Sequence, residues 1–474
     1  METDSQLADR SACELRRQIG RRELSPVDLV RACLERIEAF GGTVNAVVTL
    51  NERAEDEARE AEAALTRGLP ASLLCGLPVG IKDVTPVAGL RTTYGSPLFA
   101  THVPGDDALV VRRLKRAGAI VLGKTNTPEF AAGASTYNAV FGATRNPWNP
   151  ALTAGGSSGG GAAALAAGMV ALAEGTDLGG SLRVPAAFCG VVGFRPSAGF
   201  VPTYPSRYLW DSLQVTGGMA RTAEDVALMM TAVAGPSART PIQQPEYGPG
   251  LPDAVRRIAL GAGPRRLAYC PDIAAIGVDG EVERICRAAA GELAGEGVTV
   301  DEVDLDLSFA REAFHVLRGY WMVAHHQALL DRLDELGEDL ADNIRAGLRQ
   351  SPVRLGLAER DRSRLWERLG AFFERFDALL TPCAAVPPFP VEERYPRTIA
   401  GRPMETYIDW IAPTFLLSLS GLPSASVPAG LSAAGLPVGL QIAGRAFGEA
   451  DVLGLAARIQ ARRPIGLPEL GAGR

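Results

Sequence analysis

The apolar residues of this chain follow two alternating patterns. After Ser25 and Pro26 they recur at helical spacing, which predicts a helix that begins at Pro26 and ends at the pair Gly41 and Gly42. The same spacing predicts helices over residues 53–67, 107–117 and 223–234. Short apolar runs between turn residues predict strands over residues 44–50, 76–84, 119–122, 266–270, 298–303, 377–380, 424–427 and 438–443. This alternation predicts an α/β fold, a single large domain over residues 1–474 with a mixed, twisted central sheet covered by helices.

Two segments depart from this alternation. Residues 236–262 are rich in proline and glycine and predict a surface loop within one domain, because strand patterns resume after them. Residues 305–376 predict a mostly helical block whose aromatic side chains stand at helical spacing. Such spacing is typical of core packing and also suits a wall of a substrate pocket. These aromatic residues are Phe309, Phe314, Tyr320, Trp321, Trp366, Phe372 and Phe373.

Composition is that of an ordinary globular protein. Of the 474 residues, 47% are hydrophobic and 22% are charged, which is enough apolar material for a large core. A formal net charge of -6 argues against nucleic acid or an anionic membrane as a partner.

The seven cysteines are an odd number without a CxxC pair, so we expect buried thiols in a reducing compartment. No metal and no cofactor are expected. The N-terminal stretch has early acidic residues and lacks the apolar core and the cleavage site of a secretion signal, which predicts a cytoplasmic protein.

Lysine is rare in this chain. Of 48 basic residues, only Lys82, Lys115 and Lys124 are lysine, and the others are arginine. Arginine stays protonated in proteins, whereas burial can make lysine neutral. Each lysine is therefore a candidate general base.

The segment GAIVLGKT, residues 118–125, fits the phosphate-binding pattern GxxxxGK[ST]. That function needs a loop of exposed amides that leads into a helix. Here the four variable residues are apolar and predict a buried strand, with Lys124 at its end. A P-loop NTPase is therefore the disfavoured alternative.

The segment GGSSG, residues 155–159, fits the nucleophile-elbow pattern GxSxG with Ser157 at its centre. A hydrolase of that type needs a histidine later in the chain. The candidates His315, His325 and His326 fall inside the predicted helical block, not in a loop after a strand. Catalysis by histidine is the runner-up chemistry.

A third pattern joins three separated segments. They are GLPVGIKDV (residues 76–84), AGGSSGGGAAALAAG (154–168) and EGTDLGGSLRVPAAFCGVVGFRPS (174–197). Together they resemble the amidase signature family, with a core over residues 70–200, and the likeness extends to residues 125–150 and 424–444. The resemblance implies the amidase signature fold and amide hydrolysis by a serine, serine and lysine triad. Residue by residue, the nucleophile falls on Ser181, the serine after a cis peptide bond on Ser157, and the base on Lys82.

These three residues also make chemical sense by themselves. A serine hydroxyl attacks an amide only when a neighbouring base takes its proton. Lys82 lies in an apolar strand, where burial lowers its pKa, and strand alternation turns the adjacent Asp83 to the opposite face. Ser157 is then expected to relay a proton between Ser181 and Lys82.

The glycine-rich loop before the nucleophile suits an oxyanion hole. The consecutive amides of Leu178, Gly179, Gly180 and Ser181 are predicted to point toward one oxygen. Three further residues match the family pattern: Ser158, Asp177 and Arg183. We expect them to hold the loops through hydrogen bonds, with binding of a substrate carboxylate as the alternative role of Arg183.

The expected substrate is a small-molecule amide, with an ester, an anilide or a carbamate as further possibilities, and water completes the hydrolysis. The resemblance leaves the A subunit of the tRNA-dependent amidotransferase as the alternative within the family, although residues 199–226 depart from its pattern. We expect a monomer or homodimer. Pocket walls are predicted from residues 131–135, beginning with Ala131, and from four aromatic residues, which favours an apolar or aromatic substrate. Those four are Tyr204, Tyr208, Trp210 and Trp321.

Overall fold

The computed structural model describes residues 7–245, 250–295 and 297–470. Within these residues, one sheet of 11 strands has the order β1 (Val47–Leu50), β3 (Ile120–Thr125), β2 (Pro78–Lys82), β8 (Leu172–Asp177), β10 (Val215–Ala220), β9 (Val192–Arg195), β16 (Ser424–Leu431), β17 (Pro437–Gly444), β13 (Ala378–Pro382), β11 (Arg266–Tyr269) and β12 (Thr299–Glu302). Three two-stranded ribbons pair β4 (Tyr137–Asn138) with β5 (Gly142–Ala143), β6 (Arg145–Asn146) with β7 (Asn149–Thr153), and β14 (Thr398–Ile399) with β15 (Arg402–Pro403).

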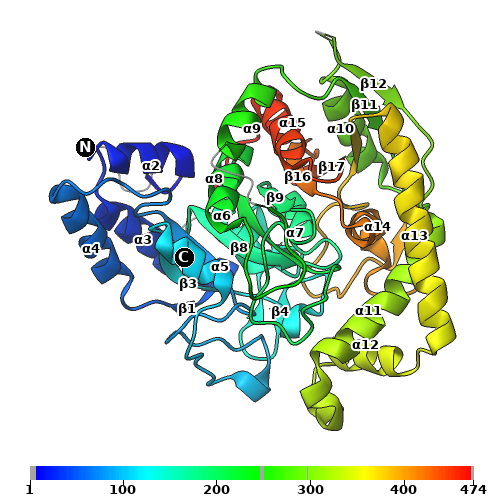
Figure 1. The fold of residues 1–474 in the computed structure, drawn as a ribbon, viewed down its shortest axis with the longest axis horizontal. Helices are drawn as coiled ribbons and strands as arrows, with labels where there is room; N and C mark the ends of the chain where they lie inside the picture. Colours follow the sequence, from blue (N-terminus) through cyan, green and yellow to red (C-terminus); the bar gives the residue numbers. More distant parts are fainter. Residues whose placement is uncertain (1–6, 246–249, 296, 471–474) are drawn as a thin grey trace.

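The helices surround this sheet (Figure 1). The α-helices are α2 (Ala12–Gly20), α3 (Pro26–Val44), α4 (Ala54–Thr66), α5 (Leu109–Arg116), α6 (Gly159–Ala166), α7 (Arg183–Cys189), α8 (Ala223–Val233), α9 (Leu251–Ala259), α10 (Gly280–Gly291), α11 (Arg311–His325), α12 (Glu338–Leu348), α13 (Pro352–Arg375), α14 (Ala412–Ser420) and α15 (Glu449–Arg462). Short 3-10 helices are η1 (Pro97–Phe99), η2 (Glu129–Ala131), η3 (Ser308–Ala310), η4 (Gln327–Glu335) and η5 (Asp409–Ile411).

The sheet is mixed, so the predicted α/β fold is confirmed. β2 runs parallel to both β3 and β8, and β11 runs parallel to both β12 and β13. The other neighbouring pairs are antiparallel. All five strands predicted after residue 262 join this same sheet.

Two hydrophobic cores pack against the sheet. One includes buried side chains of α2, α3, α6, α8, α9 and α15, and the other includes those of α11 to α14. α7 contributes to both, because Ala186 belongs to the first core and Phe188 to the second. In Figure 1, α2 to α4 lie at one end of the molecule, and α11 to α13 lie along the opposite side. The segment between β8 and α7 therefore lies where the two cores meet.

The predicted end of the helix that begins at Pro26 was wrong. α3 continues through Gly41 and Gly42 to Val44, because Phe40 and Val44 are both buried on one face and their burial outweighs the helical cost of glycine. The helix ends at Asn45, which has a left-handed conformation with φ 52°.

The predicted loop over residues 236–262 contains a helix. Leu251, Val255 and Ile258 recur at helical spacing and are buried in α9, which packs against α15. Residues 246–249 of the predicted loop lie outside the described residues. The block over residues 305–376 is mostly helical, as expected, and within it Trp366 and Tyr320 are exposed on the surface.

α6 brings its N-terminal end close to β3. Every residue of α6 is buried. A Cβ atom at Gly160 would lie 2.2 Å from the backbone nitrogen of Asn126, so glycine is required for this approach. The close packing fixes the position of the two serines that precede the helix. Among the described residues, no helix combines the length and the apolar character needed to cross a membrane.

Candidate active site

A hydrogen bond joins Lys82 to Ser157. Lys82 ends β2, and Ser157 precedes α6 and follows a cis peptide bond with Gly156. The Lys82 Nζ atom lies 2.7 Å from Ser157 Oγ and 3.0 Å from Thr176 Oγ1. Thr176 comes from β8, the parallel neighbour of β2. The sheet and the packing of α6 therefore bring an amine and two hydroxyls together.

The charge of Lys82 is set by its burial. The side chain is fully buried, and this lowers the pKa of the Lys82 ammonium to about 7, against the opposing charges of Glu174 and Asp177. The Asp83 carboxylate pairs instead with Lys124, whose Nζ lies 3.6 Å from Asp83 Oδ1. This arrangement matches the opposite faces predicted for Lys82 and Asp83. A large fraction of Lys82 is therefore neutral near pH 7, as a proton acceptor requires.

Ser181 lies in the tight loop between β8 and α7. In the described chain, the amides of Leu178, Gly179 and Ser181 have no acceptor within the protein. Gly180 differs from the prediction, because its N–H donates to Asp177 Oδ1 at 2.9 Å. Its φ of 131° is a conformation that favours glycine. The loop thus offers three amides to a ligand, and the fourth holds the loop itself.

Ser158 connects the two serine segments. Its N–H donates to the carbonyl oxygen of Ser181 at 3.1 Å, and its hydroxyl donates to the carbonyl oxygen of Thr176 at 3.4 Å. Ser157 and Ser181 line the same pocket, although no hydrogen bond joins their hydroxyls in the described part of the chain. Catalytic hydrogen bonds are often long in unliganded enzymes and shorten when substrate binds.

A buried ionic cluster supports the Ser181 loop. The Asp177 carboxylate accepts hydrogen bonds from the Arg183 side chain and from the Leu182 amide, and forms an ion pair with Arg195. Burial alone would raise the pKa of Asp177, but the two arginines outweigh it and hold that pKa well below its ordinary value. The five N–H groups of Arg183 all have acceptors within the protein, on Asp177, Thr414, Ser418 and Gln441. Arg183 therefore holds the loop with all of its donors, and its alternative role in binding a substrate carboxylate is not supported.

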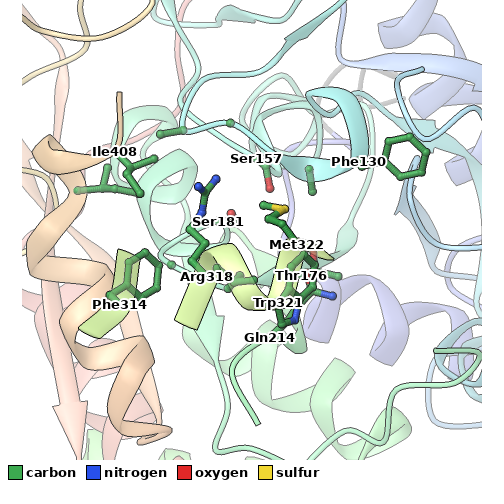
Figure 2. A pocket seen from close by; sticks show the side chains of 16 residues that line it. Phe130, Ser157, Thr176, Ser181, Gln214, Phe314, Arg318, Trp321, Met322 and Ile408 are labelled. Carbon is green, nitrogen blue, oxygen red and sulfur yellow. The ribbon is translucent and has the colours of Figure 1, made fainter. Parts of the chain in front are cut away.

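The pocket beside Ser181 is narrow, with a cavity volume of about 30 Å³. Figure 2 shows Ser157 and Ser181 pointing into it, with Arg318 reaching in from α11. Ala131, which was predicted from the sequence, lines it together with Gly133 and Ala134. The other lining residues are Phe130, Thr176, Leu178, Gly179, Gln214, Phe314, Trp321, Met322, Ile408 and Ile411.

A larger chamber adjoins this pocket. It has a volume of about 540 Å³ and shares five lining residues with the pocket: Phe130, Ala131, Thr176, Gln214 and Trp321. Tyr204 lines the chamber, as predicted, along with Tyr94 and Phe99. Trp210 was a wrong prediction, because its side chain is 70% exposed on the surface. Tyr208 lines a separate small cavity that also contacts Gln214.

The three candidate histidines interact with groups other than the candidate nucleophiles. His315 pairs with Asp409, at 3.3 Å, and His325 stacks on Trp321 with ring centroids 4.0 Å apart. His326 Nδ1 lies 2.8 Å from the Met322 carbonyl oxygen. In the described chain no hydrogen bond joins a histidine to Ser157 or Ser181. The geometry therefore favours lysine over histidine as the base.

Lys124 lies in a strand and not in a phosphate-binding loop. β3 covers the apolar residues and Lys124 itself, and no helix follows directly. Its ammonium group is fully buried and donates to the Thr85 carbonyl oxygen and to Thr92 Oγ1. Together with the Asp83 ion pair, these bonds hold the turn that follows β2.

Replacing Lys124 by methionine should lower the free energy of unfolding by about 3 kcal/mol, because Asp83 would be left buried without its cation. Urea denaturation measures this loss. The matched change Lys115→Met removes a half-exposed pair with Asp107 and should cost less than about 1 kcal/mol. Amide hydrolysis should stay measurable in the folded Lys124→Met protein. ATP binding to the wild type that disappears in this variant would contradict the structural role.

Several pocket residues gave no signal in the sequence. Thr176 lies inside the segment of residues 174–197 but has no role in the family pattern, and Gln214 and Met322 occur in no motif. Arg318 is one of many arginines and reaches the pocket only because α11 packs over it. Such residues become visible only when distant segments are brought together.

Comparison with known proteins gives consistent findings. The profile of a family described as Amidase matches residues 28–453. An acylamidase of Rhodococcus erythropolis is 34% identical over 98% of this chain and 97% of the relative. The A subunit of a glutamyl-tRNA(Gln) amidotransferase of Moorella thermoacetica is 36% identical over 89% of this chain and 90% of the relative. Among solved structures, a bacterial aryl acylamidase of the amidase signature family superposes with a TM-score of 0.88 at 29% identity, over 96% of both chains.

Proposed function

This chain belongs to the amidase family and is a hydrolase of amide C–N bonds, and from that premise we propose that it cleaves carboxylic amides through an acyl-enzyme on Ser181. Ser181 is the nucleophile, Lys82 the base, and Ser157 the proton relay between them. The substrate is a small-molecule amide, and water is the second reactant. Esters, anilides and carbamates are cleaved by the same groups.

In the first step, neutral Lys82 accepts the proton of the Ser157 hydroxyl, and Ser157 in turn takes the proton of Ser181. The Ser181 oxygen then attacks the amide carbonyl carbon, and negative charge develops on the carbonyl oxygen. The amides of Leu178, Gly179 and Ser181 are the available donors for that charge. Return of the proton through Ser157 to the amide nitrogen breaks the C–N bond and releases the amine.

In the second step, water attacks the ester that links the acyl group to Ser181. Its proton moves through Ser157 to Lys82, and the Ser181 oxygen is protonated again as the carboxylic acid leaves. Lys82 therefore takes up and returns one proton in each half of the reaction. A pKa of about 7 suits both directions at neutral pH.

The single observation that carries this proposal is the contact between Lys82 and Ser157. A fully buried amine lies 2.7 Å from a serine hydroxyl in a pocket that also contains Ser181. A buried lysine in a purely structural role is expected to pair with a carboxylate, as Lys124 does with Asp83. The bonds of the Lys82 amine go to two hydroxyls instead.

Release of ammonia from glutamine is a second candidate function, because this chain is 36% identical in sequence to one amidotransferase A subunit. That role requires a partner subunit and would leave the isolated chain with weak activity on anilides. The departure of residues 199–226 from the pattern of those subunits favours a free-standing amidase. Glutamine therefore belongs in any substrate panel.

We propose a cytoplasmic location and a monomer or homodimer. Six of the seven cysteines are buried thiols, and all seven are free, which suits a reducing compartment. The formal net charge of -6 does not favour nucleic acid or an anionic membrane as a partner.

Covalent trapping tests the nucleophile. Aryl carbamates should carbamoylate the protein, because the Ser181 oxygen forms a bond to the carbamoyl carbon and the aryl alcohol leaves, while the resulting carbamate hydrolyses slowly. Intact-mass measurement should find one adduct per chain, and peptide mapping should place it on Ser181. The Ser181→Ala variant should gain no mass. An adduct on Ser157 or on a cysteine would overturn the assignment.

A further inference from the structure

Arg318 places a buried positive charge in the pocket of the nucleophile. It lies in the middle of α11, and its side chain reaches the pocket that also contains Ser181 and Ser157 (Figure 2). The residue is only 6% exposed. Among the described residues that line this pocket it is the one with a charge, and most of the others are apolar or small.

The hydrogen bonds of Arg318 leave most of its donors unused. One N–H of Nη1 donates to Asn343 Oδ1, and one N–H of Nη2 donates to the Tyr407 hydroxyl. In the described chain these are the acceptors found for its five N–H groups, and both are uncharged. Arg183, two residues after Ser181, differs from Arg318. All five of its N–H groups have acceptors, and Asp177 is its counter-ion.

The nearby carboxylates are paired with other cations. Asp339, whose backbone carbonyl accepts from Asn343, has its side chain in an ion pair with Arg394. Asp409, next to the pocket residue Ile408, pairs with Arg311 and with His315. In the described chain the Arg318 guanidinium lies over the Tyr407 ring, 5.4 Å from the ring centroid, but has no counter-ion. An anion that arrives with the ligand would therefore be favoured there.

We propose that Arg318 binds a carboxylate of the substrate, so that the preferred substrates are amides of short dicarboxylic acids. This inference rests on the proposed function of Ser181. Arginine is suited to the task, because its planar fork of donors matches the two oxygens of a carboxylate. No proton transfer is assigned to Arg318; it orients the acyl group and selects the substrate.

The two cavities indicate where each part of the substrate lies. Ser181 and Arg318 line one narrow pocket, so the proposal places a short group between the scissile carbonyl and the carboxylate. The adjoining chamber of about 540 Å³, with Tyr94, Tyr204 and Trp321 in its wall, accommodates an apolar or aromatic amine. The substrate class is therefore the N-aryl monoamide of a short dicarboxylic acid.

A matched pair of substrates tests the proposal. Succinic acid mono-4-nitroanilide carries the carboxylate, and 4-methylpentanoic acid 4-nitroanilide has nearly the same shape without the charge. For the wild type, kcat/KM should be at least about 100-fold higher for the charged substrate. In Arg318→Met this preference should disappear, because kcat/KM falls for the charged substrate and not for the neutral one. Arg318→Lys should restore part of the preference. A purely structural role would lower kcat/KM for both substrates equally and would overturn the proposal.

Arg311→Met is the matched control. Arg311 is on the same helix, pairs with Asp409 and does not line the pocket, so the variant should keep the preference of the wild type. Circular dichroism and the thermal midpoint show whether each variant is folded. If Arg318→Met does not fold, Arg318→Gln replaces it, because glutamine keeps donors for Asn343 and Tyr407 but lacks the charge.

A binding measurement separates this proposal from the proposed function. Succinate should bind to Ser181→Ala in calorimetry, and the additional change Arg318→Met should weaken that binding by about 10-fold or more. If the wild type hydrolyses the neutral anilide and shows no preference for the charged one, the amidase function stands and the carboxylate site is wrong. If neither anilide is hydrolysed but succinate binds in an Arg318-dependent way, the carboxylate site stands and the reaction assigned to Ser181 is wrong.

Discussion

Ser181→Ala should lower kcat for amide hydrolysis by about 10⁴-fold or more, with a much smaller change in KM. Alanine removes the oxygen that forms the acyl-enzyme. The loop amides and the pocket walls that bind the substrate stay in place, because the Asp177 cluster holds the loop through other residues. Steady-state release of 4-nitroaniline measures kcat and KM together.

Ser424→Ala is the control for this loss. Ser424 is a fully buried serine in β16 whose hydroxyl has no hydrogen-bond partner among the described residues. Its removal deletes the same atom from the core and should leave kcat unchanged within about two-fold. A Ser181→Ala enzyme that keeps more than about a hundredth of the wild-type kcat would show that another group attacks the amide.

Lys82→Arg should be nearly as inactive as Lys82→Ala, with a loss of kcat of about 10³-fold or more. Arginine keeps the positive charge and much of the length, but it cannot lose its proton in a protein. It therefore cannot accept the proton of Ser157. A role that needed only the charge would leave this variant active.

The pH dependence of kcat/KM is a second test of Lys82 as the base. Burial lowers the pKa of Lys82 to about 7, so the amine is neutral above that pH and charged below it. The kcat/KM of the wild type should rise as pH increases through about 7 and level off above about pH 8. The rise should be missing from any residual activity of Lys82→Arg, because the guanidinium does not titrate in this range.

Lys115→Arg is the matched control among the lysines. Lys115 lies on α5 and pairs with Asp107 at a half-exposed site, so either cation satisfies that contact. Its activity and pH profile should be those of the wild type. An active Lys82→Arg enzyme with an unchanged profile would remove lysine from the mechanism.

The sequence determined the features that depend on local pattern. Alternating helical and strand spacing predicted the α/β sheet, and three separated segments, by their resemblance to a known family, pointed to Lys82, Ser157 and Ser181. The boundary at Gly41 and Gly42 was wrong, because the burial of a residue beyond them was decided by tertiary packing. The helix α9 was missed for a similar reason, because its short apolar face is buried only by packing against α15.

Only the tertiary structure decided which donors and charges are free. Gly180 was predicted to face the oxyanion, but the fold gives its amide to Asp177. Arg183 was a candidate for binding a substrate carboxylate, and its five donors are all used within the protein. Arg318 lies 137 positions after Ser181 and enters the same pocket because α11 packs across it. Hydrogen-bond partners and counter-ions come from segments far apart in the chain, so a one-dimensional pattern can name the reactive residues but cannot show which of them remain unpaired.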